Sequence, residues 1–152
     1  MRDLDYNAAM DIEFATLEID GKPRKVLMHA PKNGFFYVID RETGQLISAE
    51  KFAKVTWASK IDLATGKPVE DPMARYPNGE HFELWPSGAG AHSIYTMSYN
   101  PKTKLAYLPV LERSATMYDY GVKNGDWQKL EPVGTGQTAA AVWLFHHHCG
   151  RR

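Results

Sequence analysis

The chain has 152 residues, of which 43% are hydrophobic and 24% are charged, a composition typical of a globular domain with a core. Its 18 Lys and Arg residues balance 18 Asp and Glu residues, so the net charge of zero gives no general electrostatic attraction to nucleic acid or to an anionic membrane surface. The single cysteine, Cys149, excludes an internal disulfide, and no apolar run approaches the roughly 20 residues that span a bilayer.

The N-terminal part of the chain predicts strands. Residues 1–14 are acidic and lack an apolar segment, so we expect no secretion signal in this chain. Apolar and polar residues alternate over 12–19, which favours a strand over the short helix that residues 7–17 could form. A turn at Asp20-Gly21 and a second strand over 22–30 follow.

One kind of turn occurs three times: IDRETGQLI (39–47), IDLATGKPV (61–69) and YNPKTKLAY (99–107). Each copy has Asp or Asn, two residues, Thr, then Gly or Lys before a strand. The Asp or Asn side chain can accept a hydrogen bond from the backbone two residues on, and Gly tolerates the left-handed corner. Lys104 stands at the Gly position of the third copy, and because Lys rarely adopts positive φ we expect that copy to be imperfect.

Recurring strand–turn–strand units predict an all-β fold, with a β-propeller as the leading architecture. At about 40–45 residues per blade, the chain would hold three to four blades, an arc rather than a closed ring. Residues 70–91 are rich in Pro and Gly and predict a long loop. We expect propeller blades over residues 1–112 and a weakly matching or aberrant tail over 113–152.

Lys32 is the first candidate for a chemical role. It follows Pro31, precedes an Asn33-Gly34 corner and stands at the start of an apolar strand, which favours a fixed position over that of an ordinary surface lysine. An ammonium held there could donate hydrogen bonds to an anionic or quinonoid oxygen. Asp5 could serve as a general base if it lies near such a lysine.

Three further features leave alternatives open. His92 and Ser93 follow the Gly-rich segment 87–91, which is either a ligand-binding loop or a tight loop whose glycines serve geometry alone. The FHHHC cluster ending at Cys149 has metal-binding residue types, but consecutive positions cannot all point one way, so an accidental tail is favoured over a metal site. Trp57 is expected to be a structural core residue.

Two long segments, DGKPRKVLMHAPKNGFFYVIDRETGQLISAEKFAKVTWASKIDLATGKP and GAHSIYTMSYNPKTKLAYLP, resemble the pyrroloquinoline quinone (PQQ)-dependent alcohol dehydrogenases, in particular the methanol/ethanol and quinohaemoprotein branch. The resemblance covers residues 4–111. It implies part of an eight-bladed β-propeller, usually periplasmic, with PQQ on its axis beside a calcium ion or, in some members, a lanthanide. It also implies oxidation of primary alcohols to aldehydes, with cytochrome c or an attached haem domain as the electron acceptor.

The family motifs transfer to particular residues. The lysine of the KNG motif, which contacts the quinone oxygens in the family, corresponds to Lys32. The proposed catalytic base, which lies close to the metal, corresponds to Asp5. The resemblance implies a cofactor contact at Ser93, where the family has Asn, and this chain has Ile94 and Leu4 where the family has Trp.

The resemblance implies that Asp5 takes the alcohol proton while hydride moves to PQQ, with Lys32 and calcium stabilising charge on the quinone oxygens. We expect the isolated chain to be inactive, because an arc of blades cannot enclose PQQ. The alternative is a non-catalytic β-repeat module that binds a partner through exposed sheet edges. Such edges also predict self-association.

Overall fold

The structure is a computed structural model that describes residues 6–75, 80–117, 122–123, 126–127 and 142–148. It is built from strands, with one short 3-10 helix, η1 (Pro72–Arg75), and no α-helix among the described residues. The prediction of an all-β fold is therefore confirmed. No helix in the described part of the chain is long and apolar enough to cross a membrane.

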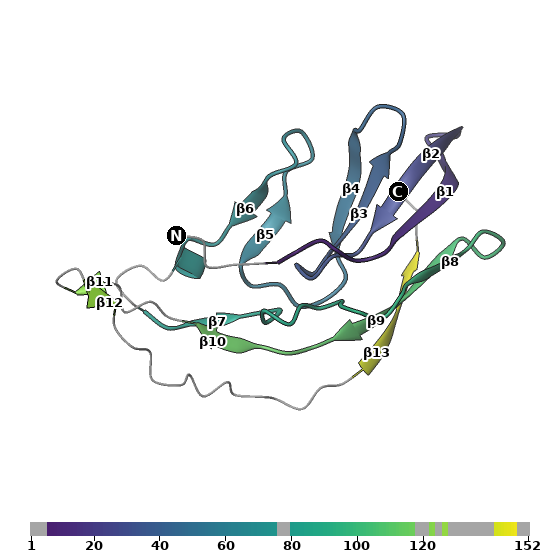
Figure 1. The fold of residues 1–152 in the computed structure, drawn as a ribbon. Helices are drawn as coiled ribbons and strands as arrows, with labels where there is room; N and C mark the ends of the chain where they lie inside the picture. Colours follow the sequence, from purple (N-terminus) through teal and green to yellow (C-terminus); the bar gives the residue numbers. More distant parts are fainter. Residues whose placement is uncertain (1–5, 76–79, 118–121, 124–125, 128–141, 149–152) are drawn as a thin grey trace.

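The largest sheet is antiparallel and has four strands in sequence order (Figure 1). Its strands are β1 (Ile12–Ile19), β2 (Lys22–His29), β3 (Phe35–Asp40) and β4 (Leu46–Lys51). Four consecutive antiparallel strands joined by short turns are the unit of a propeller blade. The strand predicted over 12–19 is confirmed, and the helical alternative is excluded.

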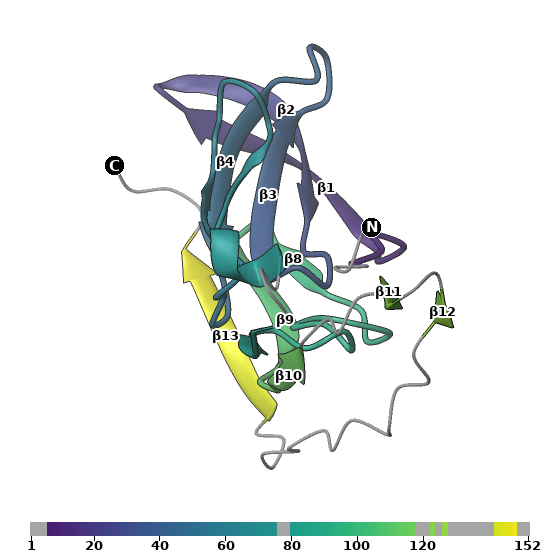
Figure 2. The same ribbon diagram turned by 90° about the vertical axis from the view of Figure 1, so that its left-hand side faces the viewer.

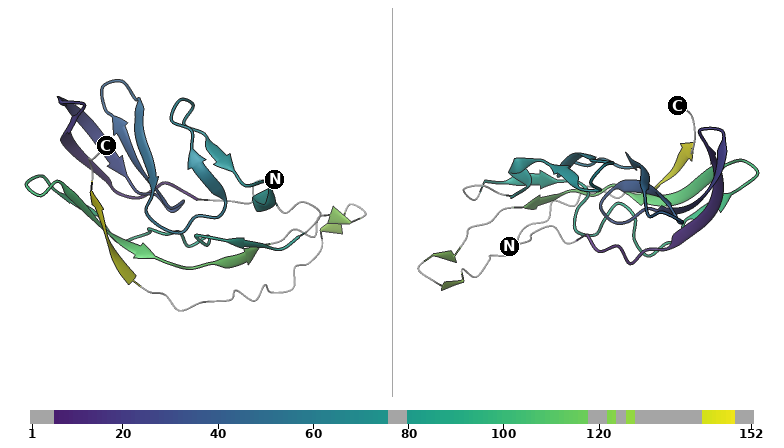
Figure 3. Two further views of the ribbon diagram at one scale, coloured as in Figure 1. Left: turned by 180° about the vertical axis from the view of Figure 1, so that it is seen from behind. Right: turned by 90° about the horizontal axis from the view of Figure 1, so that it is seen from above.

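The remaining strands form smaller antiparallel sheets. The hairpin of β5 (Ala58–Ile61) and β6 (Pro68–Glu70) stands beside β4, as Figure 3 shows from behind and from above. The other pairings join β7 (Phe82–Leu84) to β10 (Ala115–Met117), β11 (Val122–Lys123) to β12 (Asp126–Trp127), and β9 (Leu105–Leu111) to both β8 (Ser98–Asn100) and β13 (Val142–His148). Figure 2 shows β9 and β13 below the four-stranded sheet.

Strand β3 is mostly apolar up to its last residue, Asp40, because both of its faces are covered. Phe36 and Val38 join a first core with residues of β2 and β9, and Phe35 joins a second core with Trp57. The first core comprises Leu17, Val26, Met28, Ala30, Phe36, Val38, Phe52, Ala91, Met97, Ala106, Leu108 and Val110, and the second comprises Phe35, Val55, Trp57, Ala58, Ile61, Ala74 and Leu84. The four-stranded sheet is thus the middle layer between neighbours on both faces.

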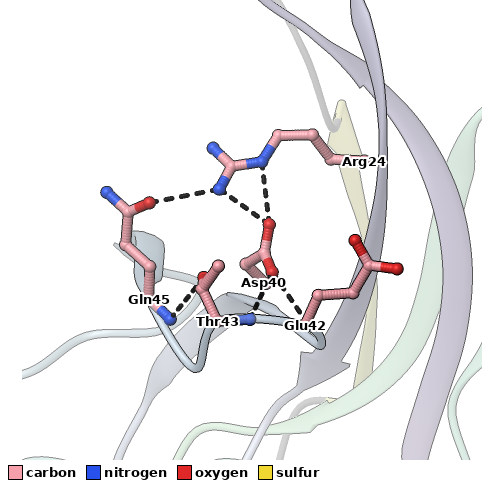
Figure 4. A network of polar contacts seen from close by, with 5 residues as sticks. All are labelled: Arg24, Asp40, Glu42, Thr43 and Gln45. Atoms are coloured by element: carbon pink, nitrogen blue, oxygen red, sulfur yellow. Dashed lines mark hydrogen bonds and ion pairs between the residues drawn. The ribbon is translucent and has the colours of Figure 1, made fainter.

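The turn between β3 and β4 forms as the sequence predicts. Asp40 Oδ1 accepts hydrogen bonds from the backbone N–H groups of Glu42 and Thr43, each at 2.8 Å, and Gly44 takes the left-handed corner at φ 74°. Asp40 Oδ2 also lies 2.7 Å from the Arg24 guanidinium, which in turn donates to Gln45 (Figure 4). The backbone N–H of Thr43 and then Arg24 hold the pKa of the Asp40 carboxyl at about 2, well below its usual value.

The other two turns repeat this geometry. Asp62 Oδ1 accepts from the backbone of Ala64 and Thr65, and the side chain of Asn100 accepts from the two corresponding N–H groups of its own turn. Lys104 occupies the left-handed corner at φ 58°, although it has a Cβ. The third turn is therefore closed in the same way as the others, but with a strained residue where they have Gly.

The structure differs from the sequence analysis in two regions. Residues 70–91 were predicted to be a loop but contain η1 and strand β7. Strands also occur beyond residue 112, where β10 pairs with β7 and β13 pairs with β9. These strands owe their place to partners far away in the chain, which local sequence patterns do not reveal. The division of the chain at residue 112 stays a prediction.

The first prediction concerns acid stability. Because the folded pKa of Asp40 is about 2 and its usual value is 3.8, the ionised carboxylate stabilises the fold above pH 3.8, and this contribution is lost as the pH falls through about 2. We expect Asp40→Asn to be less stable than the wild type at neutral pH and to lose less stability over this acid range. Urea unfolding followed at successive pH values measures both effects.

Glu42→Gln is the matched control, since it removes an exposed carboxylate of the same turn that pairs with the exposed Lys25. An unchanged acid dependence in Asp40→Asn would contradict the assignment of this stability to Asp40.

The second prediction concerns the strained corner of the third turn. Lys104→Gly is expected to raise the free energy of unfolding by about 1 kcal/mol, because Gly adopts positive φ without a steric cost. Lys102→Gly in the same turn is the control, and it should lower stability because Lys102 has no positive φ to relieve. Chemical denaturation of the three proteins measures the difference, and a less stable Lys104→Gly would contradict the prediction.

Candidate functional site

Lys32 lies in the connection between β2 and β3, and the next residue is fixed by three hydrogen bonds. The Asn33 side chain accepts from the backbone N–H of Phe35 at 3.0 Å and donates to the Tyr37 hydroxyl at 2.7 Å. The Asn33 carbonyl accepts from the indole N–H of Trp57 at 3.1 Å. Trp57 is buried at 6% exposure, which confirms its expected structural role. The corner predicted next to Lys32 is therefore rigid.

Tyr37 completes this arrangement from strand β3. Burial raises the pKa of its phenol, an effect opposed in part by the hydrogen bond from Asn33. The hydroxyl therefore stays neutral at ordinary pH and can accept the Asn33 N–H. Both the oxygen and the nitrogen of the Asn33 side-chain amide are therefore hydrogen-bonded, which fixes the orientation of the side chain.

Gly34 brings the corner against the second core. Its φ is +88°, and a Cβ at this position would lie 2.6 Å from Val55 Cγ2 and 3.5 Å from Pro86 Cδ. Its carbonyl accepts the backbone N–H of Phe52 at 3.0 Å. The corner is thus clamped between the segment after β4 and the segment after β7.

A second segment, residues 86–95, lies directly against Lys32. A Cβ on Gly90, whose φ is +87°, would lie 2.6 Å from Lys32 Cβ and 2.9 Å from Lys32 Cα. The backbone N–H of Ala91 donates to the Lys32 carbonyl at 2.9 Å. Gly90 thus permits an approach that any side chain would block. We call residues 86–95 the Gly90 loop.

His92 holds the Gly90 loop from inside. Its ring is fully buried, with Nδ1 2.6 Å from the Ala30 carbonyl and Nε2 2.6 Å from the Tyr95 carbonyl. Ser93 follows it and is half-buried. The structure therefore brings Lys32 together with the loop that carries Ser93, and the sequence analysis did not reveal the part played by Gly90 in this contact.

Asp5, the expected base and metal ligand, lies outside the described residues. The next residue, Tyr6, belongs to the described part and is anchored at the same corner. Its hydroxyl donates to the Pro86 carbonyl, and its ring centroid is 5.7 Å from that of Trp57. The chain therefore enters the described region beside the Lys32 corner.

The Lys32 side chain is suited to bind an acceptor that lies outside the described residues. It is half-buried, its stem packs on Gly90, and no described residue forms an ion pair or hydrogen bond with its ammonium. A quinone oxygen suits such a donor.

The described residues contain no group of three His, Cys, Asp or Glu side chains that could hold a metal ion. The side chains of the expected His-rich cluster lie outside the described residues.

No family model matches the chain, but individual proteins do. The quinohemoprotein alcohol dehydrogenase ADH IIB of Pseudomonas putida is 62% identical over 108 residues, which cover 71% of this chain and 16% of the relative. The 1-butanol dehydrogenase (cytochrome c) of Thauera butanivorans is 39% identical over 139 residues, covering 91% of this chain and 19% of that protein.

A solved structure supports the same relationship. The quinohemoprotein alcohol dehydrogenase ADHIIG from Pseudomonas putida superposes with a TM-score of 0.73 at 45% identity, over 83% of this chain and 18% of that one. The chain therefore spans less than a fifth of the length of each of these three proteins. Sequence and fold agree, and the chain belongs to the PQQ-dependent alcohol dehydrogenases of the quinohaemoprotein branch, of which it represents a segment of the β-propeller.

Proposed function

We propose that the chain forms the part of a PQQ-dependent alcohol dehydrogenase that contacts the quinone oxygens, in an enzyme that oxidises primary alcohols to aldehydes. One observation carries the proposal. Gly90 and the Ala91 N–H hold the backbone and stem of Lys32, while its ammonium has no partner among the described residues. A binding group that is fixed in place but unpaired is the arrangement expected of a cofactor contact.

Lys32 supplies the electrostatic part of the site. Bound PQQ would supply the acceptor for the hydride of the alcohol carbon. Lys32 would donate to the quinone oxygens and stabilise the negative charge that develops on them. A fixed donor of this kind contributes about 3–4 kcal/mol to the stabilisation of a transition state. The rigid corner at Asn33 keeps this donor in position without reorganisation during the reaction.

Ser93 and Asp5 complete the proposed site. The Ser93 hydroxyl contacts the cofactor from the Gly90 loop, with a shorter reach than the Asn of the family. Asp5 is the base that takes the alcohol proton, and it contributes to binding a calcium or lanthanide ion. The anchoring of Tyr6 on Trp57 and Pro86 supports this role, because it brings the chain next to Asp5 up to the Lys32 corner.

The electron acceptor in the proposal is a cytochrome c or an attached haem domain, and the location is the periplasm. The names of the relatives support the acceptor, since one is a quinohemoprotein and another is a 1-butanol dehydrogenase that uses cytochrome c. The second name also supports a primary alcohol as substrate. Self-association through open sheet edges stays a prediction.

The third prediction tests the proposed function in a complete propeller. A chimera of the Pseudomonas putida ADH IIB enzyme receives residues 6–117 of this chain in place of its own matching segment. We expect the chimera to bind PQQ and oxidise primary alcohols. Lys32→Met, which keeps the length of the stem but removes the charge, should lower kcat by about 10²–10³-fold and weaken PQQ binding.

PQQ titration by absorbance and steady-state kinetics measure the two effects, with Lys22→Met as the control for the loss of one exposed charge. Equal PQQ affinity and turnover in the Lys32→Met chimera would contradict the role of Lys32. A folded chimera that fails to bind PQQ would favour the non-catalytic β-repeat module.

The fourth prediction tests the close approach of the Gly90 loop. Gly90→Ala places a methyl group against the Lys32 backbone at a positive φ, so the loop or Lys32 must move. We expect weaker PQQ binding by the chimera and a loss of about 1–3 kcal/mol of stability. Gly88→Ala is the matched control, since a Cβ there meets nothing within 4 Å. Titration and thermal unfolding measure both variants, and equal behaviour of the two would contradict the prediction.

A further inference from the structure

His92 is a fully buried polar side chain that the proposed chemistry does not use. Both ring nitrogens face carbonyl oxygens, Nδ1 that of Ala30 and Nε2 that of Tyr95, each at 2.6 Å. A carbonyl oxygen can only accept, so each of these contacts needs an N–H on the ring. A neutral imidazole has one N–H and a protonated imidazole has two. The ring therefore donates to at least one of the two carbonyls, and its tautomer decides which.

The two carbonyls belong to segments that are far apart in the sequence. Ala30 ends the strand segment that leads to Lys32, and Tyr95 ends the Gly90 loop. His92 therefore spans the gap between the two, with one ring nitrogen directed to each side. No other side chain has two hydrogen-bonding nitrogens on opposite edges of a small rigid ring.

This bridge lies next to the contact that fixes Lys32. The Ala91 N–H donates to the Lys32 carbonyl, and the neighbouring His92 ring binds the Ala30 carbonyl. The Ala91 carbonyl in turn accepts the backbone N–H of Leu111 from strand β9 at 2.7 Å. The backbone around Lys32 is thereby tied to the loop at two places, and the loop is tied to a sheet.

We propose that His92 is a positioning residue, which holds the Lys32 backbone and the Gly90 loop in register so that the Lys32 ammonium meets the cofactor. This inference rests on the proposed function. His92 itself does not touch the cofactor and acts through Lys32. Its loss should therefore weaken PQQ binding only as long as Lys32 is present to be positioned.

A double-mutant cycle on PQQ affinity tests this in the chimera. His92→Leu roughly keeps the volume of the side chain and removes both ring nitrogens, and it should weaken PQQ binding about tenfold, as expected when a buried hydrogen bond is lost. In a Lys32→Met background, His92→Leu should cause no further loss, because the group that His92 positions is gone. PQQ titration of the four proteins measures the coupling without requiring turnover.

Leu108→Ala is the control for a general loss of stability. It truncates a fully buried residue of the first core that forms no part of the bridge. At a temperature where all variants are folded, it should leave PQQ affinity unchanged. If His92→Leu does not fold, His92→Gln keeps an amide NH2 group that can donate to a carbonyl, and it should give a smaller loss of affinity that depends on Lys32 in the same way.

The outcomes separate the two proposals. Equal losses from the His92 substitution with and without Lys32 would overturn the positioning role while leaving the proposed function intact. An unchanged PQQ affinity in Lys32→Met alone would overturn the proposed contact itself. If Leu108→Ala lowers PQQ affinity as much as His92→Leu does, His92 acts as an ordinary core residue, and this result would also overturn the inference.

Discussion

The close approach of Gly90 to Lys32 is the constraint on which the site depends. The backbone of Gly90 can lie against the backbone of Lys32 only because residue 90 has no side chain. The Ala91 N–H then reaches the Lys32 carbonyl. The same loop continues into the first core through Ala91 and binds strand β9 through the N–H of Leu111. One contact thus links the candidate cofactor donor to the packing of two sheets, and a change at Gly90 affects chemistry and fold together.

The fold supports this contact by making the lysine corner rigid from the other side. Strand β3 is covered on both faces, so its first residues cannot shift, and Asn33 is held by its own side chain and by Trp57. A flexible lysine loses side-chain entropy when it binds an acceptor, and a lysine whose stem is already packed loses less. This explains why a cation stands at the entrance of so apolar a strand. The corner restricts the stem while leaving the ammonium without a described partner.

Local chemistry was predictable from the sequence, whereas contacts between distant segments were not. The turns at Asp40 and Asp62 and the strand over 12–19 follow from side-chain hydrogen bonding and from alternation, which act within a few residues. The contact of Gly90 with Lys32 depends on tertiary packing, and a Gly-rich segment alone does not say which residue it approaches. Strand β7 was missed for the same reason, because three residues become a strand only when β10 lies beside them. The family resemblance identified Lys32, but only the structure reveals how the fold holds it.

The most direct test of the account is a crystal structure of the chimera with PQQ bound. We predict the Lys32 ammonium within hydrogen-bonding distance of a quinone oxygen, with the Ala91 N–H still bound to the Lys32 carbonyl and the His92 ring still between its two carbonyls. A structure in which PQQ is bound while the Lys32 ammonium points to solvent, or in which the Gly90 loop has moved away from Lys32, would contradict the central claim.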